Sequence, residues 1–201
     1  REYALGKQSG KATIRKNLEE FGLELNPEII ARVAERVIEL GDKKESVTRD
    51  DLPFIIADVL GEDRSGYRVF IRNYSLNLTC GLKPSASVQV EIDGILHQET
   101  AAGDGQYDAF MKALRKVYES LGTGLPLLTD YEVSIPPGGK TDALVETVIR
   151  WNHNGREFRT RGLDADQTES AIKATEKMLN IICSNETNHE YTKLIEIANE
   201  L

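Results

Sequence analysis

The chain has 201 residues, with 40% hydrophobic residues, 29% charged residues and a net charge of −8, a composition typical of a globular protein with one or two domains. The acidic balance excludes the basic face that nucleic-acid binding needs. No apolar run approaches the roughly 20 residues of a membrane span, and no signal-peptide pattern opens the chain. Cys80 and Cys183 are predicted to be buried thiols in a reducing compartment, which favours a cytoplasmic location. The opening at Arg1 indicates a piece cut from a longer protein.

Residues 1–62 are predicted to form a helical linker subdomain. Ser9 and Thr48 are residue types that favour the N-cap position, and Pro27 suits the first helical position. Apolar residues recur at helical spacing after each of them. Three amphipathic helices are therefore expected, over residues 9–21, 27–41 and 52–60.

A polar segment with glycine at both ends, residues 61–66, separates this subdomain from a second domain over residues 63–201. Alternation of apolar and polar residues predicts three strands, and Asp93-Gly94 is a strong hairpin signal between the last two. The expected strands cover residues 67–78, 86–92 and 95–101. A helix follows from Asp104, with an apolar stripe made of Tyr107, Phe110, Met111, Leu114, Val117, Tyr118 and Leu121.

The same order of elements then returns, with Asn154-Gly155 as the second hairpin turn. Its strands are expected near residues 127–135, 143–151 and 157–161, and its helix carries apolar residues from Ala171 to Ile182. A separate last helix, at about residues 188–201, is expected to pack at an edge. The predicted fold class is α+β, a helical linker subdomain followed by a duplicated βββα domain.

The helix of each copy begins beside acidic residues, at Gly103-Asp104-Gly105 in the first copy and at Asp164-Ala165-Asp166 in the second. Backbone N–H groups at a helix N-terminus attract anions such as a carboxylate, so the two openings predict a small-molecule sensor. The structural alternative stays open, because the same aspartates are suitable helix caps.

Catalysis is disfavoured. No histidine has a second His or Cys at metal-ligand spacing, and no nucleophile elbow, Walker motif or complete dinucleotide fingerprint is present. We therefore predict no catalytic residue and no metal site. The turn at residues 136–141 is either a structural corner or a loop over a ligand, and Tyr107 and Tyr131 are either pocket walls or packing residues.

At this point a family resemblance is clear. Residues 67–182 resemble the C-terminal regulatory domain of the 2-isopropylmalate synthase and citramalate synthase family. Residues 5–11 resemble the start of its linker subdomain, with Gln8 where the family usually has histidine, so no acid–base role is expected there. The matching segments of the domain are Gly103–Ala109, Leu128–Tyr131, Gly139–Val145 and Asp164–Asp166.

The resemblance implies a full acyltransferase that condenses acetyl-CoA with a 2-oxo acid on a metal-dependent TIM barrel. That barrel is absent here, so the divalent metal and acetyl-CoA would belong to the missing part, and the fragment alone should be inactive and hold no cofactor. The regulatory domain would form a homodimer and bind the end-product amino acid near its interface. The implied effector-binding residues are Gly103, Asp104, Gly105, Tyr107, Asp108, Ala109, Leu128, Tyr131, Ile135, Thr141, Ala143, Val145 and Asp166.

Two alternatives for the function remain. Leucine would be the effector of an isopropylmalate synthase, which is the expected member, and isoleucine that of a citramalate synthase. These ligands differ by one methyl position, which a hydrophobic pocket discriminates by only ~1–3 kcal/mol. The second alternative is a structural dimerisation domain without effector binding.

Overall fold

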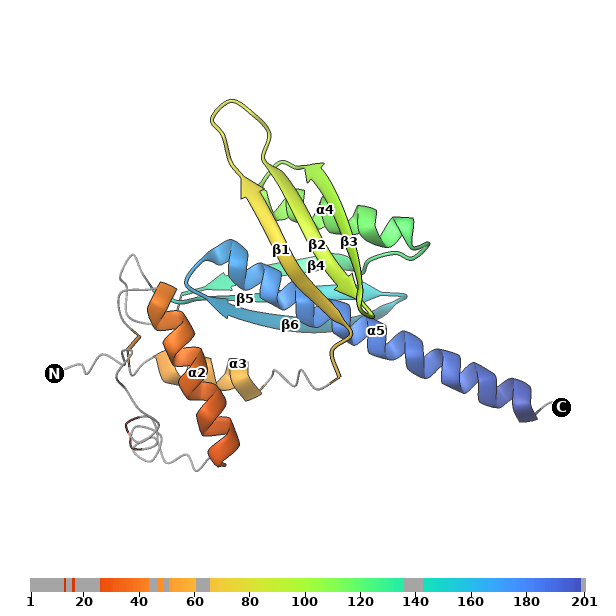
Figure 1. Cartoon of the computed structure of the whole chain (residues 1–201), viewed down its shortest axis with the longest axis horizontal. Helices are drawn as coiled ribbons and strands as arrows, with labels where there is room; N and C mark the ends of the chain where they lie inside the picture. Colours follow the sequence, from red (N-terminus) through yellow and green to blue (C-terminus); the bar gives the residue numbers. More distant parts are fainter. Residues whose placement is uncertain are drawn as a thin grey trace. The chain divides into compact units, whose positions relative to one another are not determined.

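The computed structural model of the chain describes Thr13, Lys16 and residues 26–43, 47–48, 51–60, 66–135 and 143–199. Within these ranges it contains four helices and two three-stranded sheets, which confirms the predicted α+β class (Figure 1). The chain divides into two compact units, each built from segments that are distant in the sequence. Unit 1 consists of residues 1–63, 131–148 and 161–173, and unit 2 of residues 64–130, 149–160 and 174–201.

Several predicted features lie outside the described residues. They are Gln8, the apolar positions of the first predicted helix, most of the segment 61–66 and the turn at residues 136–141. Of the first predicted helix the structure describes Thr13 and Lys16, and both are helical.

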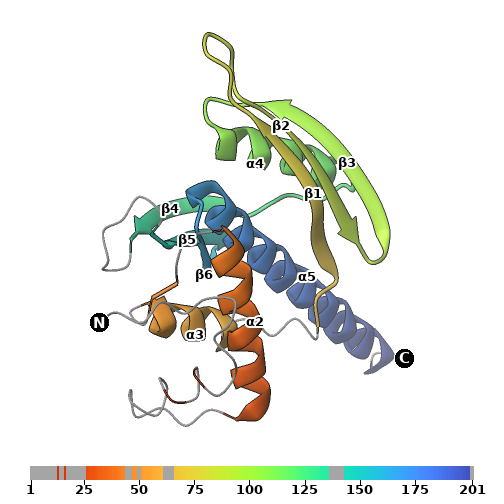
Figure 2. The same cartoon turned by 60° about the vertical axis from the view of Figure 1, so that its left-hand side comes forward.

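Unit 1 contains the helices α2 (Pro27–Lys43) and α3 (Leu52–Leu60), which pack against each other (Figure 2). The Ile29 N–H donates to Asn26 Oδ1 over 2.8 Å, so the asparagine side chain caps α2. The helix runs two residues beyond the end that was predicted at Gly41. At the start of α3, the Thr48 N–H donates to Asp51 Oδ2 over 2.7 Å.

The core of unit 1 joins these two helices to the second repeat. Apolar side chains of α2 and α3 pack with Leu144 and Leu163, both of which are fully buried. The buried apolar members from the helical part are Ile30, Val33, Ala34, Val37, Leu40, Val47, Leu52, Ile55, Ile56 and Val59. The helical subdomain therefore shares a hydrophobic core with residues that the sequence assigns to the other domain.

Unit 2 contains the sheet of the first repeat, with the strands β1 (Val69–Asn77), β2 (Ser85–Ile92) and β3 (Ile95–Ala102) in the order β1-β2-β3. Both strand pairs are antiparallel, and Ile92 is paired with Ile95 across a two-residue turn. The φ angles of Asp93 and Gly94 are +50° and +81°, as in the type I′ turn that this dipeptide predicted. A register shift between Ile71 and Asn73 marks a bulge in β1.

The helix α4 (Gln106–Ser120) packs on β2 and β3, and Figure 2 shows it along one face of this sheet. Its predicted stripe is confirmed from Phe110 to Tyr118, since these positions are buried. Leu121 is 43% exposed because the helix ends at Ser120 and Leu121 is its C-cap.

The second repeat has the strands β4 (Leu127–Ser134), β5 (Val145–His153) and β6 (Arg156–Asp164) in the order β4-β5-β6. Asn154 and Gly155 have φ angles of +53° and +81°, so the second hairpin turn is confirmed as well. The helix α5 (Gln167–Asn199) follows and is continuous. The expectation of a separate last helix from about residue 188 was therefore wrong.

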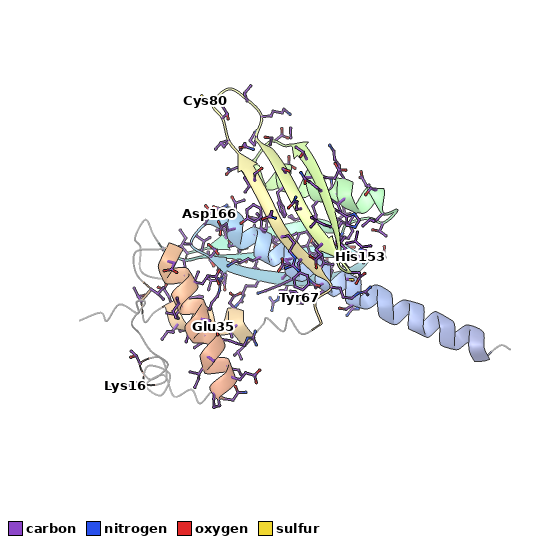
Figure 3. The ribbon with its side chains drawn as sticks, viewed as in Figure 1. Lys16, Glu35, Tyr67, Cys80, His153 and Asp166 are labelled. Carbon is purple, nitrogen blue, oxygen red and sulfur yellow. The ribbon has the colours of Figure 1, made fainter. Side chains whose placement is uncertain are left out.

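The cysteine prediction was wrong for Cys80, which is exposed in the loop between β1 and β2 (Figure 3), while Cys183 is half-buried. Neither is in a disulfide. Among the described helices, none combines the length and the apolar character of a membrane span.

Within unit 2, side chains of α5 hydrogen-bond the backbone of β1, an edge strand. Asn180 Oδ1 accepts from the N–H groups of Arg68 (2.8 Å) and Val69 (3.0 Å), and Asn180 Nδ2 donates to the Val69 carbonyl over 2.8 Å. The Ile71 N–H donates to Glu176 Oε2 over 2.8 Å. These bonds satisfy polar groups that an unpaired strand edge would leave without partners.

Asn180 is only 5% exposed, so its loss should leave several backbone groups of β1 unsatisfied in the interior. We expect Asn180→Leu to lower the free energy of unfolding by roughly 2–4 kcal/mol, since each such group costs about 1–3 kcal/mol. Chemical denaturation followed by circular dichroism measures this change. Asn77→Leu, on the exposed end of the same strand, should stay within about 0.5 kcal/mol of the wild type. Equal effects of the two substitutions would contradict the role given to Asn180.

Candidate functional site

The opening of α4 carries no side-chain cap. Its N-cap residue is Gly105, in an extended conformation (φ −146°, ψ 170°), and no side chain bonds to the first turn from this position. The interpretation of Asp104 as the cap was therefore wrong. Its carboxylate instead pairs with Lys83 Nζ over 3.0 Å, in an ion pair that is exposed on both sides. The first-turn N–H groups thus have no cap from the N-cap residue, which is the arrangement that suits an incoming anion.

Gly103 is required by the close approach of the turn before α4. A Cβ atom on Gly103 would lie 2.3 Å from the backbone nitrogen of Ala109 and 2.7 Å from Asp108 Oδ2. The Gly103 N–H also donates to the Pro84 carbonyl over 2.9 Å. Gly105 differs, because nothing lies within 4 Å of a Cβ built there. Gly103 is therefore required by close packing, whereas the space beside Gly105 would admit a side chain.

Asp108 fixes the same turn from inside the helix. Its Oδ2 accepts from the Asp104 N–H over 2.8 Å and pairs with Lys112 Nζ over 2.7 Å. The hydrogen bond from Lys112, followed by the one from Asp104, holds the pKa of the Asp108 carboxyl below its ordinary value. The Asp108 carboxylate is thus charged, and its Oδ2 is already hydrogen-bonded within the turn.

Tyr107 is anchored on both sides. Its hydroxyl lies 2.7 Å from Thr175 Oγ1 on α5, and its ring stacks on Phe110 with centroids 6.1 Å apart. Ala109, another residue of the predicted set on the same helix, is fully buried. Tyr107 is therefore a half-buried packing residue that also borders the α4 opening.

At the start of α5, in contrast, the N-cap side chain does accept hydrogen bonds from the first turn. Asp166 Oδ1 accepts from the N–H groups of Thr168 (2.8 Å) and Glu169 (2.9 Å), so Asp166 is the N-cap. The cap interpretation is confirmed here. Both bonds use one oxygen of an exposed carboxylate, which leaves the second oxygen for a cation.

Tyr131 borders the start of α5 within unit 1. Its hydroxyl hydrogen-bonds with Gln167, the first residue of the helix, and with Thr147 on β5. Burial raises the pKa of the Tyr131 phenol, an effect that those two hydrogen bonds oppose. Thr147 Oγ1 also hydrogen-bonds with Ser170 Oγ. The tyrosine is thus a neutral group fixed against the first turn of α5.

The predicted effector residues fall into both units. Those in unit 2 are Gly103, Asp104, Gly105, Tyr107, Asp108, Ala109 and Leu128, and those in unit 1 are Tyr131, Ile135, Thr141, Ala143, Val145 and Asp166. Leu128 and Ile135 are 42% and 62% exposed, and Ala143 and Val145 are half-buried. Thr141 lies outside the described residues.

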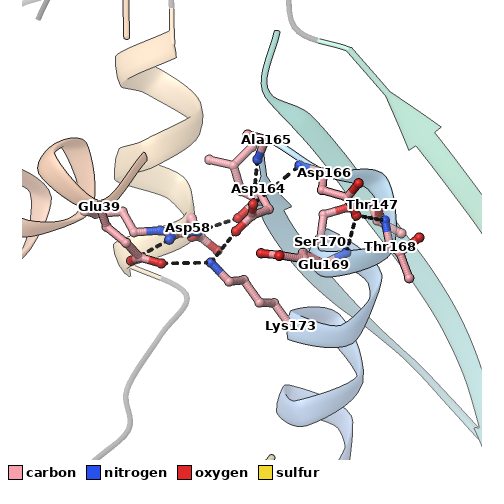
Figure 4. A network of polar contacts seen from close by, with 12 residues as sticks. Glu39, Asp58, Thr147, Asp164, Ala165, Asp166, Thr168, Glu169, Ser170 and Lys173 are labelled. Carbon is pink, nitrogen blue, oxygen red and sulfur yellow. Dashed lines mark hydrogen bonds and ion pairs between the residues drawn. The ribbon is translucent and has the colours of Figure 1, made fainter. Parts of the chain in front are cut away.

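A buried polar network lies beside the α5 opening, in unit 1 (Figure 4). Asp164 is fully buried, with Oδ2 at 2.7 Å from Lys173 Nζ and Oδ1 accepting from the Ala165 N–H over 2.8 Å. Lys173 Nζ also lies 3.3 Å from Glu39 Oε1 on α2. The network therefore joins the β6–α5 turn to the helical part of the unit.

Arg36 is the centre of this network on α2. Its Nε donates to Asp58 Oδ2 over 3.2 Å, its Nη1 pairs with Glu39 Oε2 over 2.7 Å, and its Nη2 donates to the Leu163 carbonyl. Burial lowers the pKa of Arg36, but Glu39, Asp58 and Asp164 raise it above its ordinary value overall. The guanidinium is thus held charged in the interior by carboxylates from two helices and a turn.

Sequence reasoning missed Arg36, Glu39, Asp58 and Lys173 altogether. Each lies on a helix where a charged residue usually faces solvent, and only the Asp-Ala-Asp pattern before α5 gave a signal for this region. In the described part of the chain, no three His, Cys, Asp or Glu side chains gather in a way that could hold a metal ion.

The sequence matches the LeuA allosteric (dimerisation) domain family over residues 46–183. The chain belongs to this family. The family resemblance seen in the sequence is therefore confirmed. The matched region includes α3 and both repeats, whereas α2, with Arg36 and Glu39, lies before it.

Three relatives extend the similarity to most of the chain. A probable 2-isopropylmalate synthase of Methanopyrus kandleri is 37% identical over 176 residues, which are 87% of this chain and 35% of that protein. A 2-isopropylmalate synthase of Pyrococcus furiosus is 35% identical over 179 residues, 89% of this chain and 34% of that protein. A putative (R)-citramalate synthase of Archaeoglobus fulgidus is 30% identical over 182 residues, 90% and 36% respectively. The chain thus spans about a third of the length of these relatives.

The two glycines of the α4 opening in this LeuA domain should respond differently to substitution. We expect Gly103→Ala to lower the free energy of unfolding by about 1–3 kcal/mol, because its Cβ would overlap the backbone of Ala109. Gly105→Ser should be neutral or stabilising by a few tenths of a kcal/mol, because serine fits the open N-cap position. Thermal unfolding of both variants measures the difference. A Gly103→Ala variant as stable as the wild type would exclude the close approach.

The network predicts an acid-sensitive component of stability. Burial raises the pKa of Glu39, but Arg36 and Lys173 outweigh this effect and lower it below the ordinary value of 4.5. A carboxyl whose pKa is lowered by folding stabilises the fold above its unfolded pKa, and this stability is lost as the pH falls through the folded pKa. Glu39→Gln should therefore lose less stability than the wild type below about pH 4.5. Denaturation midpoints between pH 7 and the acid limit of folding test this, and parallel curves would contradict it.

Proposed function

We propose that this chain is the regulatory part of a 2-isopropylmalate synthase, which binds leucine for feedback inhibition and holds the enzyme as a cytoplasmic homodimer. The observation that carries the proposal is the uncapped opening of α4 in a chain that belongs to the LeuA allosteric (dimerisation) domain family. In the same chain, the equivalent opening of α5 is capped by its own aspartate. The repeat therefore keeps one helix N-terminus for an external anion.

The carboxylate of a free amino acid is the anion that suits this opening. Gly105 has no side chain that could cap the first turn, and Gly103 lets the preceding backbone approach closely. Hydrogen bonds from such groups to a charged acceptor contribute about 1.5–3 kcal/mol each. The partial positive charge of the helix N-terminus adds to this attraction.

The remaining parts of an aliphatic amino acid bound at this opening have candidate partners within unit 2. For the ammonium group, the candidate is the exposed carboxylate of Asp104, which also pairs with Lys83. For the side chain, unit 2 offers the exposed Leu128. An apolar group with a few polar contacts is typical of small-ligand sites.

The strand β4 supports the proposed homodimer. It is at the edge of its sheet, and four apolar side chains at or beside it remain exposed. An edge strand with exposed apolar side chains is prone to pair with another chain. Their exposed fractions are 67% for Leu127, 42% for Leu128, 36% for Val133 and 62% for Ile135. A second copy of this chain is the partner that a dimerisation domain would place there.

The reaction itself would belong to the rest of the protein. We infer that the missing part, about two thirds of the length of the relatives, carries the acyltransferase chemistry, with its divalent metal and acetyl-CoA. The fragment alone should then be inactive. A citramalate synthase regulated by isoleucine is the alternative, supported by the similarity to a putative (R)-citramalate synthase.

Isothermal titration calorimetry tests the proposal directly. We expect leucine to bind with a dissociation constant in the micromolar range, about −8 kcal/mol, and isoleucine more weakly. Gly105→Ser should weaken leucine binding at least about tenfold, because its hydroxyl competes with the ligand for the same N–H groups. Gly124→Ser is the matched control, since Gly124 is exposed and has nothing within 4 Å of a built Cβ.

The outcomes separate the alternatives. Tighter binding of isoleucine than of leucine would favour the citramalate synthase alternative. No heat with either amino acid, together with a dimer in sedimentation, would favour a purely structural dimerisation domain. Equal leucine affinity in the wild type and in Gly105→Ser would exclude the α4 opening as the carboxylate site.

A further inference from the structure

The hairpin turn between β5 and β6 contains the one Asn-Gly pair of the sequence, Asn154-Gly155. Asparagine is a chemically labile residue, because the backbone nitrogen of the next residue can attack the carbon of its side-chain amide. Glycine in the next position has no Cβ to hinder this approach. Both residues are exposed to water. The turn therefore combines a reactive pair with access to the water that completes the reaction.

The first repeat shows that this turn accepts an aspartate. Asp93 and Gly94 have φ angles of +50° and +81°, and Asn154 and Gly155 have φ angles of +53° and +81°. An aspartate at position 154 would thus fit the same backbone. An isoaspartate would not, because its main chain runs through the side-chain carbons and is longer than the two-residue turn allows. The two products of deamidation should therefore differ in their effect on the hairpin.

The side chains of the two turns differ in their reactivity. Arg68 donates from Nε and Nη2 to Asp93 Oδ1 and Oδ2 over 2.6 and 2.7 Å. A carboxylate in such a fork is negatively charged and is a poor target for a nucleophile. The Asn154 carboxamide is neutral, and its Nδ2 lies 3.4 Å from Nε2 of His153, which Figure 3 labels. The turn of the second repeat is thus the more reactive of the two.

Asn152 restrains the attacking nitrogen. The Gly155 N–H donates to Asn152 Oδ1 over 3.1 Å. Attack requires the Gly155 nitrogen to move into contact with Asn154 Cγ, and rotation of this peptide group breaks the bond to Asn152. The Asn152 carboxamide therefore opposes the reaction.

We propose that Asn154 is a site of spontaneous deamidation and that Asn152 is a positioning residue that limits its rate. The Gly155 nitrogen forms a bond to Asn154 Cγ, the Cγ–Nδ2 bond breaks, and Nδ2 leaves as ammonia with the proton that the Gly155 nitrogen loses. Water then opens the cyclic succinimide at either carbonyl, which gives aspartate or isoaspartate at position 154. This inference is independent of the proposed function, because Asn152, Asn154 and Gly155 lie in one hairpin of unit 2.

The test uses the full-length protein that contains this chain, incubated at physiological temperature and pH. Peptide mapping by mass spectrometry measures aspartate and isoaspartate at position 154 over time. Asn152→Ala is the main variant, and Asn152→Asp is the second, because aspartate keeps an acceptor oxygen for the Gly155 N–H. Asn73→Ala is the matched control, because Asn73 is an exposed asparagine that donates to Gln89 Oε1 over 2.7 Å in the other sheet.

The expected result is that product accumulates at position 154 faster than at the other asparagines of the chain. Asn152→Ala should raise this rate about fivefold, which corresponds to the roughly 1 kcal/mol of one hydrogen bond. Asn152→Asp and Asn73→Ala should match the wild type. In concentrated urea, the wild type and Asn152→Ala should react at the same rate, because the hairpin that holds Gly155 is then absent.

Four outcomes would overturn the inference in whole or in part. A folded wild type that forms no product at position 154, while the unfolded chain does, would exclude the site. Equal rates in the folded wild type and in folded Asn152→Ala would exclude the role of Asn152. Acceleration that persists in urea would assign the effect to the local sequence instead of the hydrogen bond. Equal acceleration at every asparagine of Asn152→Ala would show general unfolding instead of a released turn.

Discussion

The buried carboxylate of Asp164 is the constraint on which the arrangement of unit 1 depends. A fully buried charge is tolerated only if partners replace the water that it loses. Here Lys173 supplies a charge at 2.7 Å, and two backbone N–H groups of the following turn supply hydrogen bonds. These partners fix the end of β6, the cap of α5 and one turn of that helix at once. Through Arg36 and Glu39, the same constraint extends to α2.

The two repeats share a fold but differ in the chemistry of their helix openings. In the second repeat, the Asp166 carboxylate occupies the N–H groups of α5, and the helix needs no external partner. In the first repeat, the N-cap residue is Gly105, which has no side chain to do this, and the preceding Asp104 pairs with Lys83. A helix N-terminus without a side-chain cap is the arrangement that suits an external anion. This asymmetry links the fold to the regulatory role that we propose.

The helical subdomain and parts of the second repeat, residues 131–148 and 161–173, form one structural unit. Leu144 and Leu163 complete the core of α2 and α3, and the Arg36 network lies beside them. Residues that are more than 100 positions apart therefore pack as neighbours, as in the bond from Arg36 to Leu163. A boundary based on the polar segment at residues 61–66 marks a change in secondary structure. The hydrophobic contacts of α2 and α3 continue across this boundary to Leu144 and Leu163.

The local elements could be predicted from the sequence because they depend on short-range physics. Asp93-Gly94 and Asn154-Gly155 adopt the positive φ angles that define their turns, and the apolar stripe of α4 is buried as its spacing indicates. The roles of polar side chains could not be predicted this way. Asp104 and Asp166 have the same cap chemistry, yet Asp104 lies one position before the N-cap residue Gly105 and pairs with Lys83, whereas Asp166 caps its helix. The sequence by itself thus determined the α+β repeat and the family, because turn chemistry and periodicity act over a few residues. Only the tertiary structure decided which charges are buried together, since Arg36, Asp58 and Asp164 meet only after distant segments have packed.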